Sequence, residues 1–159
     1  MENASTGAGD VWAHYLRALI RIGVGGRTLA IQLLDDDDPR LQCSGPWPFD
    51  GSVVILTAWN PGSRPRAHKA NTAAQEALEA ELRAAGYALL PAEGIGPDTG
   101  WSEPSVAVPG MDVAAAVETG VRHGQRALYR LHASAAEVIG CLDGDRRERR
   151  AWRSHWENG

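Results

Sequence analysis

A glutamate and a serine two residues apart, Glu103 and Ser105, have the types and spacing that could carry out proton transfer. Alternate residues of a strand point to the same face of a sheet, so in a strand these two side chains would share one space. A carboxyl group that is removed from water has a raised pKa and can exchange a proton near neutral pH. We therefore take Glu103 as a candidate acid or base and Ser105 as its catalytic neighbour.

Amide side chains elsewhere in the chain supply donors and acceptors that could orient a small polar molecule or stabilise developing charge. Tryptophans near them could form the walls of a binding site. Each of these residues also has a structural explanation, since asparagine before proline is common in turns and an amide can satisfy a buried strand end. The sequence leaves both explanations open. The ligand-binding candidates are Trp59, Asn60, Ser63, Asn71, Trp101 and Gln125.

Apolar and polar residues follow the patterns of strands and amphipathic helices between residues 53 and 131. The expected elements are a strand at 53–57, a helix at 70–85, a strand at 87–92, a strand around 106–108, a helix at 112–123 and a strand at 125–131. This order is that of the ferredoxin-like split βαβ unit. The predicted fold class is therefore α+β, with a ferredoxin-like βαββαβ core over about 53–131.

The expected topology brings the candidate residues together. Two right-handed crossovers make the first and third strands neighbours in an antiparallel sheet, with the fourth strand on the other side of the first. The first strand then ends at Asn60 where the third begins, near Glu103, and where the fourth begins, near Gln125. Asn71 lies in the first turn of the helix that leaves from this end. The glycine-rich segment 93–100 could close over it.

The segments on either side of this core are expected to extend the sheet. Residues 15–34 carry glycines between two apolar runs, which predicts an N-terminal β-hairpin, and residues 137–142 predict a C-terminal edge strand. The predicted boundaries are a disordered start at 1–10, a single α+β domain at 11–142 and an arginine-rich tail at 143–159.

The arginine-rich tail has two interpretations. Trp152 and Trp156 are four residues apart, a spacing that fits a helix resting both tryptophans on the domain. An arginine-rich helix could also grip phosphate or an acidic partner. A weak contact with nucleic acid is therefore left open for Arg146, Arg147, Arg149 and Arg150.

Composition excludes several broad classes of protein. The formal charge of −4 gives no general attraction to nucleic acid or to an anionic membrane. No apolar run has the length of a transmembrane helix, and the N-terminal residues do not resemble a signal peptide, so we expect no membrane contact and a cytoplasmic location. Cys43 and Cys141 are then expected to be reduced thiols. The spacing of cysteines and histidines predicts no metal site, and no cofactor is expected.

Four motifs, in the order in which they occur, resemble a bacterial protein family. They are TAWNPGS at 57–63, Asn71 followed by Leu78 and Leu82, EPS at 103–105 after Trp101, and GQRA at 124–127. Over about residues 15–140 the chain is similar to the family called domain of unknown function 3293. The resemblance implies signature positions at Asn60, Pro61, Ser63, Asn71, Glu103, Pro104, Ser105, Gly124 and Gln125. It implies no reaction.

Two hypotheses of different classes follow from the sequence. The leading one is a site for a small polar molecule at one end of the central strands, with Glu103 as acid or base and the amides as positioning groups. The alternative is a non-catalytic regulatory or adaptor module that binds a protein or nucleic-acid partner through its sheet edges or its basic tail. Whether the chain is an enzyme is left open.

Overall fold

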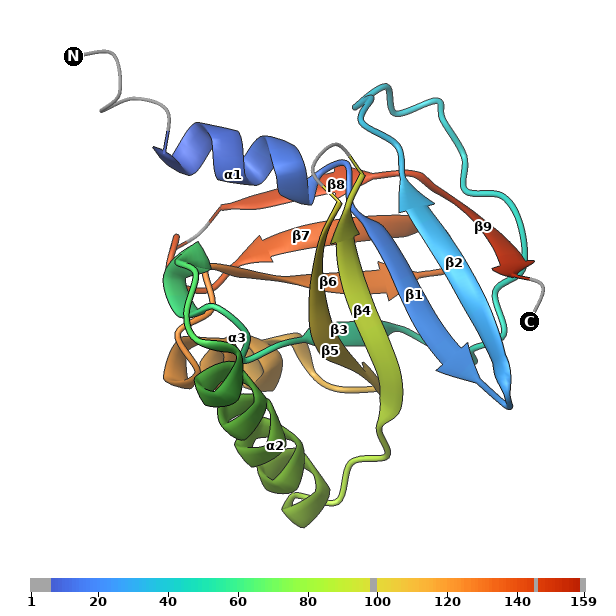
Figure 1. Cartoon of the computed structure of the whole chain (residues 1–159). Coiled ribbons are helices and arrows are strands. Elements are labelled where there is room, and N and C mark those ends of the chain that lie inside the picture. Colours follow the sequence, from blue (N-terminus) through green and yellow to red (C-terminus); the bar gives the residue numbers. More distant parts are fainter. Residues whose placement is uncertain (1–6, 98–99, 145, 158–159) are drawn as a thin grey trace.

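The computed structural model describes residues 7–97, 100–144 and 146–157, in which nine strands form one sheet (Figure 1). The strands are β1 (Leu19–Val24), β2 (Arg27–Leu33), β3 (Val53–Leu56), β4 (Leu90–Gly96), β5 (Trp101–Pro109), β6 (Ala127–His132), β7 (Ala135–Gly140), β8 (Arg147–Arg150) and β9 (Trp152–Glu157). The helices are α1 (Gly7–Tyr15), α2 (His68–Ala84) and α3 (Val113–Arg122), with a short 3₁₀ turn at Pro61–Ser63. All named strand pairs are antiparallel, in the order β8-β7-β6-β3-β5-β4-β1-β2-β9.

The sheet curls into a nearly closed barrel, and the chain itself shows why. Only Ala151 separates β8 from β9, yet β8 pairs with β7 at one edge of the sheet and β9 pairs with β2 at the other. Two strands joined by one residue lie close together, so the two edges must meet. The carbonyl of Ala151 accepts a hydrogen bond from the Leu34 amide at 3.0 Å, which ties the junction to the end of β2.

The predicted ferredoxin-like α+β fold is wrong, because the nine-stranded barrel-like sheet replaces a four-stranded open one. The expected neighbours of β3 are present, since β3 lies between β5 and β6. However, the strands from both ends of the chain extend this sheet and curl it, and α2 and α3 cover only part of its outer face (Figure 1). Local patterns within 53–131 could not reveal pairing with residues outside that range.

The segment expected as an arginine-rich helix forms β8 and β9 instead. Trp152 and Trp156 are four residues apart, and an even spacing also places two side chains on one face of a strand. Both tryptophans pack in or against the core inside the barrel. The spacing therefore fits either structure, and pairing with β2 selects the strand.

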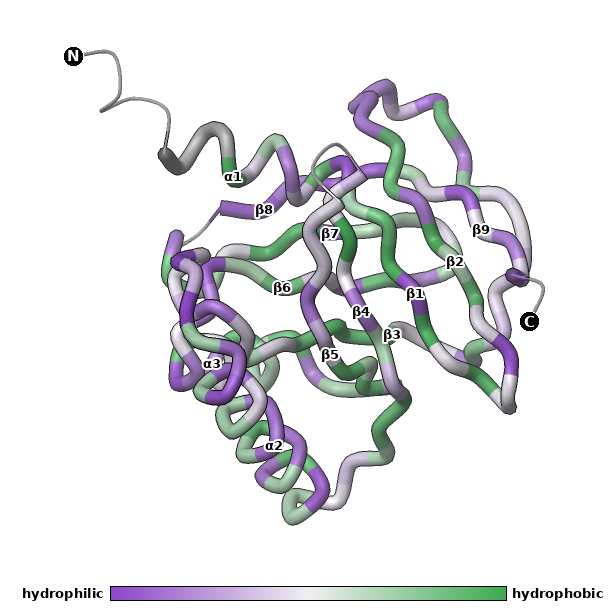
Figure 2. Tube along the Cα trace, viewed as in Figure 1, coloured by the Kyte–Doolittle hydropathy of each residue, from purple (hydrophilic) through white to green (hydrophobic). Residues whose placement is uncertain are grey.

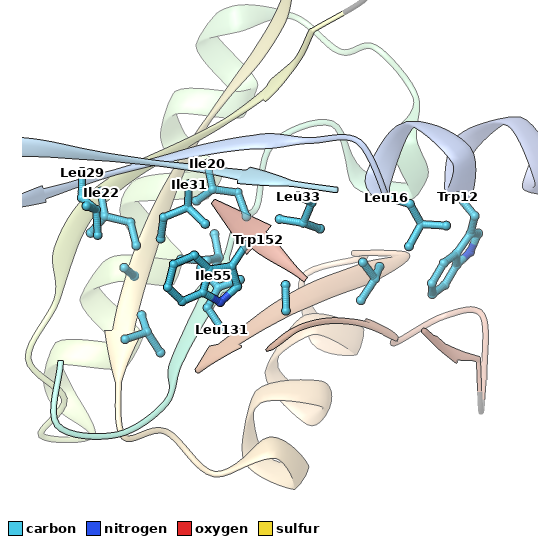
Figure 3. Packing of buried hydrophobic residues seen from close by; sticks show 14 residues of the cluster. Trp12, Leu16, Ile20, Ile22, Leu29, Ile31, Leu33, Ile55, Leu131 and Trp152 are labelled. Atoms are coloured by element: carbon cyan, nitrogen blue, oxygen red, sulfur yellow. The ribbon is translucent and has the colours of Figure 1, made fainter. Parts of the chain in front are cut away.

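Two apolar cores lie on opposite faces of the sheet. The core inside the barrel includes, at one end, Trp12 of α1 and Leu16, the residue that follows this helix (Figure 3). The outer core lies where α2 and α3 pack on the sheet, and in Figure 2 both helices alternate between hydrophobic and hydrophilic residues. β3 is buried along its whole length because it contributes to both cores, as its apolar sequence predicts.

The ends of several elements also differ from expectation. The glycine turn between β1 and β2 confirms the hairpin, but α1 precedes it. β4 continues to Gly96 and β5 begins at Trp101, so residues 93–96 of the expected flexible segment 93–100 are strand, while residues 98–99 lie outside the described part. The expected disordered start falls partly on residues 1–6, which are also outside it. Among the helices described, none has the length and apolar character needed to cross a membrane.

Candidate functional site

A cavity of about 300 Å³ opens into one end of the barrel. It lies where β3 and β4 end and β5 and β6 begin, and α1 runs across this end (Figure 1). Most of its wall is apolar or aromatic, including Val11, Ala18, Ile55, Ala127 and Tyr129. Its polar lining comes from four segments and consists of His14, Tyr15, Thr57, Asn60, Ser63, Glu103, Ser105 and Gln125.

Glu103 is the one carboxyl group in the described lining of this cavity. Its residue is 8 % exposed, and burial raises its pKa to about 8. The Asn60 amide Nδ2 donates to Glu103 Oε2 at 3.4 Å, a long hydrogen bond that lowers the pKa by less than burial raises it. Glu103 therefore exists in both protonation states at mildly alkaline pH, as an acid or base requires.

Asn71 lies behind the cavity and holds Asn60 in place. Its Oδ1 accepts from the backbone amide of Asn60 at 2.9 Å, and its Nδ2 donates to Asn60 Oδ1 at 2.7 Å. Asn60 has a left-handed backbone with φ of 46°, which asparagine tolerates better than most residues. Asn71 is 1 % exposed, so its role in the structure is to orient Asn60 rather than to contact a ligand.

The other residues expected at the site divide in the same way. Ser63, Trp101, Ser105 and Gln125 line the cavity, whereas Trp59 does not. The Trp59 ring packs edge-on against His68, and its carbonyl accepts from Gln125 Nε2 at 3.3 Å. The structure thus brings six of the eight expected residues to the cavity wall and places Trp59 and Asn71 behind it.

Gln75 is a structural residue that sequence reasoning missed. It lies on α2 and is 6 % exposed, and its Oε1 accepts from the Ala58 amide at 2.8 Å. This bond fixes the chain where it leaves β3. A glutamine within a helix looks like part of a solvated face, so only its place one turn after Asn71 could have identified it.

Helix α1 also contributes to the site, which the sequence did not predict. The hydroxyls of Tyr15 and Ser63 are 2.6 Å apart, and the Tyr129 hydroxyl donates to the Tyr15 carbonyl at 3.1 Å. Burial raises the pKa of Tyr15 to about 12 and raises the pKa of Tyr129 further, so both phenols stay neutral. The buried pair Trp12 and Leu16, four residues apart, is the helical signal that could have revealed α1.

The glycine of the GQRA motif locks the turn after β3 to the start of β6. Gly124 has φ of 73°, and its carbonyl accepts a hydrogen bond from the Gly62 amide. A Cβ at Gly124 would lie 2.9 Å from the Cβ of Pro61. This close approach brings the TAWNPGS and GQRA motifs into direct contact. It also places Gln125 where its side chain donates to the Trp59 carbonyl.

Replacing Gly124 by alanine is expected to lower the free energy of unfolding by about 2–3 kcal/mol, from the positive φ and the contact with Pro61 together. Gly86→Ala is the matched control, because Gly86 also has a positive φ, of 94°, but a Cβ there meets no atom within 4 Å. The control is expected to lose about 1 kcal/mol. Urea unfolding of both variants measures the difference, and equal losses would contradict the role of the Pro61 contact.

The arginines of the expected tail are engaged within the sheet. Arg147 forms an ion pair with Glu137 at 2.9 Å, and Arg146 forms one with Glu148 at 3.0 Å. Arg150 also pairs with Glu148, while Arg149 donates to the Ser134 carbonyl. In the described residues Cys43 and Cys141 are free thiols, and no group of three or more histidines, cysteines or acids is placed to hold a metal.

Residues 56–128 match the family described as "Protein of unknown function (DUF3293)". This match confirms the resemblance identified from the four motifs. The matched segment runs from the end of β3 into β6 and contains every signature position, from Asn60 to Gln125. No curated protein and no solved structure matches the chain.

Proposed function

For a chain whose residues 56–128 match a family of unknown function, we propose that the barrel mouth binds a small molecule with an apolar body and a polar head. The observation that carries the proposal is the cavity of about 300 Å³ with a single buried carboxyl group, Glu103, among apolar walls. Ligand sites in proteins typically combine an apolar concave wall with a few converging polar groups. Glu103 is the contact for the polar head and the group able to exchange a proton with it.

The absence of a side chain at Gly94 leaves the room for the ligand. Gly94 is paired in register with Glu103 on β5 and with Ile20 on β1. Paired residues point to the same face of a sheet, and Ile20 lies in the core inside the barrel, so position 94 also faces inward. A Cβ at Gly94 would meet no atom within 4 Å. The cavity therefore extends beside Glu103 because residue 94 is a glycine.

Filling this space tests the proposal without touching the polar network. Gly94→Leu is expected to fold as the wild type does and to weaken binding of any cavity ligand at least tenfold, because its side chain occupies the cavity. Gly51→Leu makes the same change at an exposed loop glycine whose Cβ also meets no atom within 4 Å, and it serves as the control. The measurement is a thermal-shift screen of fragment-sized compounds followed by calorimetry.

The outcomes of this screen separate the hypotheses. Compounds that stabilise the wild type and Gly51→Leu but not Gly94→Leu support binding in the cavity. Compounds that stabilise all three proteins equally bind elsewhere, and a screen that yields only these would contradict the proposal. Glu103→Gln adds a second test, since a binding role predicts lost affinity in a folded protein.

A further inference from the structure

We infer that the head of the ligand is a cationic amine, whose N–H groups donate to the Glu103 carboxylate. The inference rests on the proposed function, because it names the chemical class of molecule that the same cavity takes. Three features of the described residues support it. They are the direction of the hydrogen bonds that lead to Glu103, the charges around the cavity, and the rings in its wall.

The side-chain hydrogen bonds that link Arg66 to Glu103 through Asn71 and Asn60 all donate in the direction of Glu103. The Arg66 guanidinium Nε donates to Asn71 Oδ1 at 3.0 Å, and Asn71 Nδ2 donates to Asn60 Oδ1 at 2.7 Å. The Asn60 oxygen also accepts from the Arg66 amide, so the Asn60 Nδ2 group is the one left to face Glu103. A series of hydrogen bonds that begins at a cation and ends in a donor favours an ionised acceptor at its end. Glu103 is thus held as an acceptor.

The ionised carboxylate lacks a positive partner in the protein. In the stretches that the structure describes, Glu103 takes its one side-chain hydrogen bond from Asn60, at 3.4 Å, and forms no ion pair. A carboxylate removed from water is stabilised strongly by a cation that reaches it. Glu103 lines the cavity, so a ligand can supply that cation.

The wall of the cavity suits a cation better than an anion. The described lining contains no lysine or arginine, and His14 is its one basic residue. An anionic head would therefore meet Glu103 without a compensating guanidinium or ammonium group. Tyr15, Trp101 and Tyr129 bring three aromatic side chains to the lining, and aromatic rings attract cations electrostatically.

Binding of an amine has a proton balance that can be measured. Near pH 7 the Glu103 carboxyl of the ligand-free protein is protonated, because its pKa is about 8. The free amine is also protonated at this pH and carries a positive charge. Forming the ion pair breaks the Glu103 O–H bond and releases that proton to the buffer, while the ammonium keeps all of its protons. Affinity should therefore rise about eightfold between pH 6.5 and 7.5, level off above pH 8 and fall when the amine loses its charge near pH 10.

Other titratable groups face Glu103 from the surrounding elements. α1 contributes His14 and Tyr15, and β6 contributes Tyr129, whereas β3 and β4 contribute none to the described lining. Both tyrosines stay neutral over the range of the experiment, since burial raises the pKa of each. Beyond the lining, Arg66 acts on Glu103 through Asn71 and Asn60.

The experiment uses matched probes with the same apolar body. Butylamine, hexylamine, benzylamine and 2-phenylethylamine are each compared with the corresponding alcohol by calorimetry, in two buffers that differ in ionisation enthalpy. We expect at least one amine to bind the wild type ten times more tightly than its alcohol and to release close to one proton at pH 7. Gly94→Leu should lose this binding, while Gly51→Leu should retain it.

Glu103→Gln should abolish the preference for the amine and the rise of affinity with pH. The buffer comparison and the pH series on the wild type test the inference even if this variant does not fold. Alcohols that bind as tightly as their amines, an amine that binds without releasing a proton, or four amines that all fail to bind would each overturn it. The proposed function is decided separately, since it fails only if the fragment screen finds no compound that distinguishes Gly94→Leu from Gly51→Leu.

Discussion

The free energy of unfolding of the wild type is expected to fall by roughly 3–5 kcal/mol as pH rises from about 5 to 9, and Glu103→Gln should remove this fall. Burial raises the pKa of Glu103 from 4.5 to about 8. Between these values the folded protein holds a proton that the unfolded chain has lost. The stabilising contribution is therefore complete below pH 4.5 and is lost as pH rises through 8. The glutamine side chain does not ionise, so the variant should be more stable than the wild type at pH 9.

Urea unfolding at pH 5, 7 and 9 measures this dependence. Glu118→Gln is the control, because Glu118 is exposed on α3 and its removal should leave the pH dependence of the wild type unchanged. If the wild type and Glu103→Gln gave parallel curves, Glu103 would be solvated when ionised, and its role as a buried acid or base would be contradicted.

Replacing Trp152 by alanine is expected to lower the free energy of unfolding by about 3–5 kcal/mol, the usual loss for a large buried aromatic side chain. Trp152 is 1 % exposed inside the barrel, where its ring centroid lies 5.4 Å from that of Trp47. Its Nε1 group donates to the His132 carbonyl at 2.9 Å, which links β9 to the end of β6. The variant thus loses both apolar packing and a hydrogen bond across the barrel.

Trp156→Ala provides the comparison on the same face of β9. Trp156 is only partly buried, and its ring lies under the Arg27 guanidinium at 4.1 Å. We expect it to lose about 1 kcal/mol. Similar losses at the two positions would contradict a barrel closed around Trp152. Removing residues 144–159 would delete both β8 and β9, so such a truncation could not test partner binding by this segment separately from folding.

The central part of the fold could be predicted because its signals are local. Apolar runs, the amphipathic pattern of α2 and the N-cap at Asp112 define elements within 53–131, and the handedness of crossovers then orders β5, β3 and β6. Closure of the barrel could not be predicted in this way. It depends on pairing of β9 with β2, and β9 follows directly on a strand whose arginines resemble a solvated tail.

The candidate site was predictable to the extent that its residues follow strand ends. Asn60, Glu103, Ser105 and Gln125 lie at the ends of neighbouring strands, so the order of strands alone brought them together. Tyr15 was missed because it lies on α1, and this helix is next to the cavity only because the sheet closes into a barrel. The structure also shows that the cavity is mostly apolar. This could not be predicted, because which residues face into the barrel depends on strand pairing that the sequence did not reveal.

The single-residue junction at Ala151 has a consequence for how the protein reaches its folded state. The free edge of β2, at residues 27–33, pairs with β9, at residues 152–157. This edge therefore stays unpaired until the end of the barrel sequence has been synthesised. Contacts so distant along the chain slow folding and lengthen the time for which apolar strands are exposed. The apolar inner face of the β1–β2 hairpin packs in the same core as Trp152 of β9. During synthesis, this face therefore stays accessible to chaperones until nearly all of the barrel has left the ribosome.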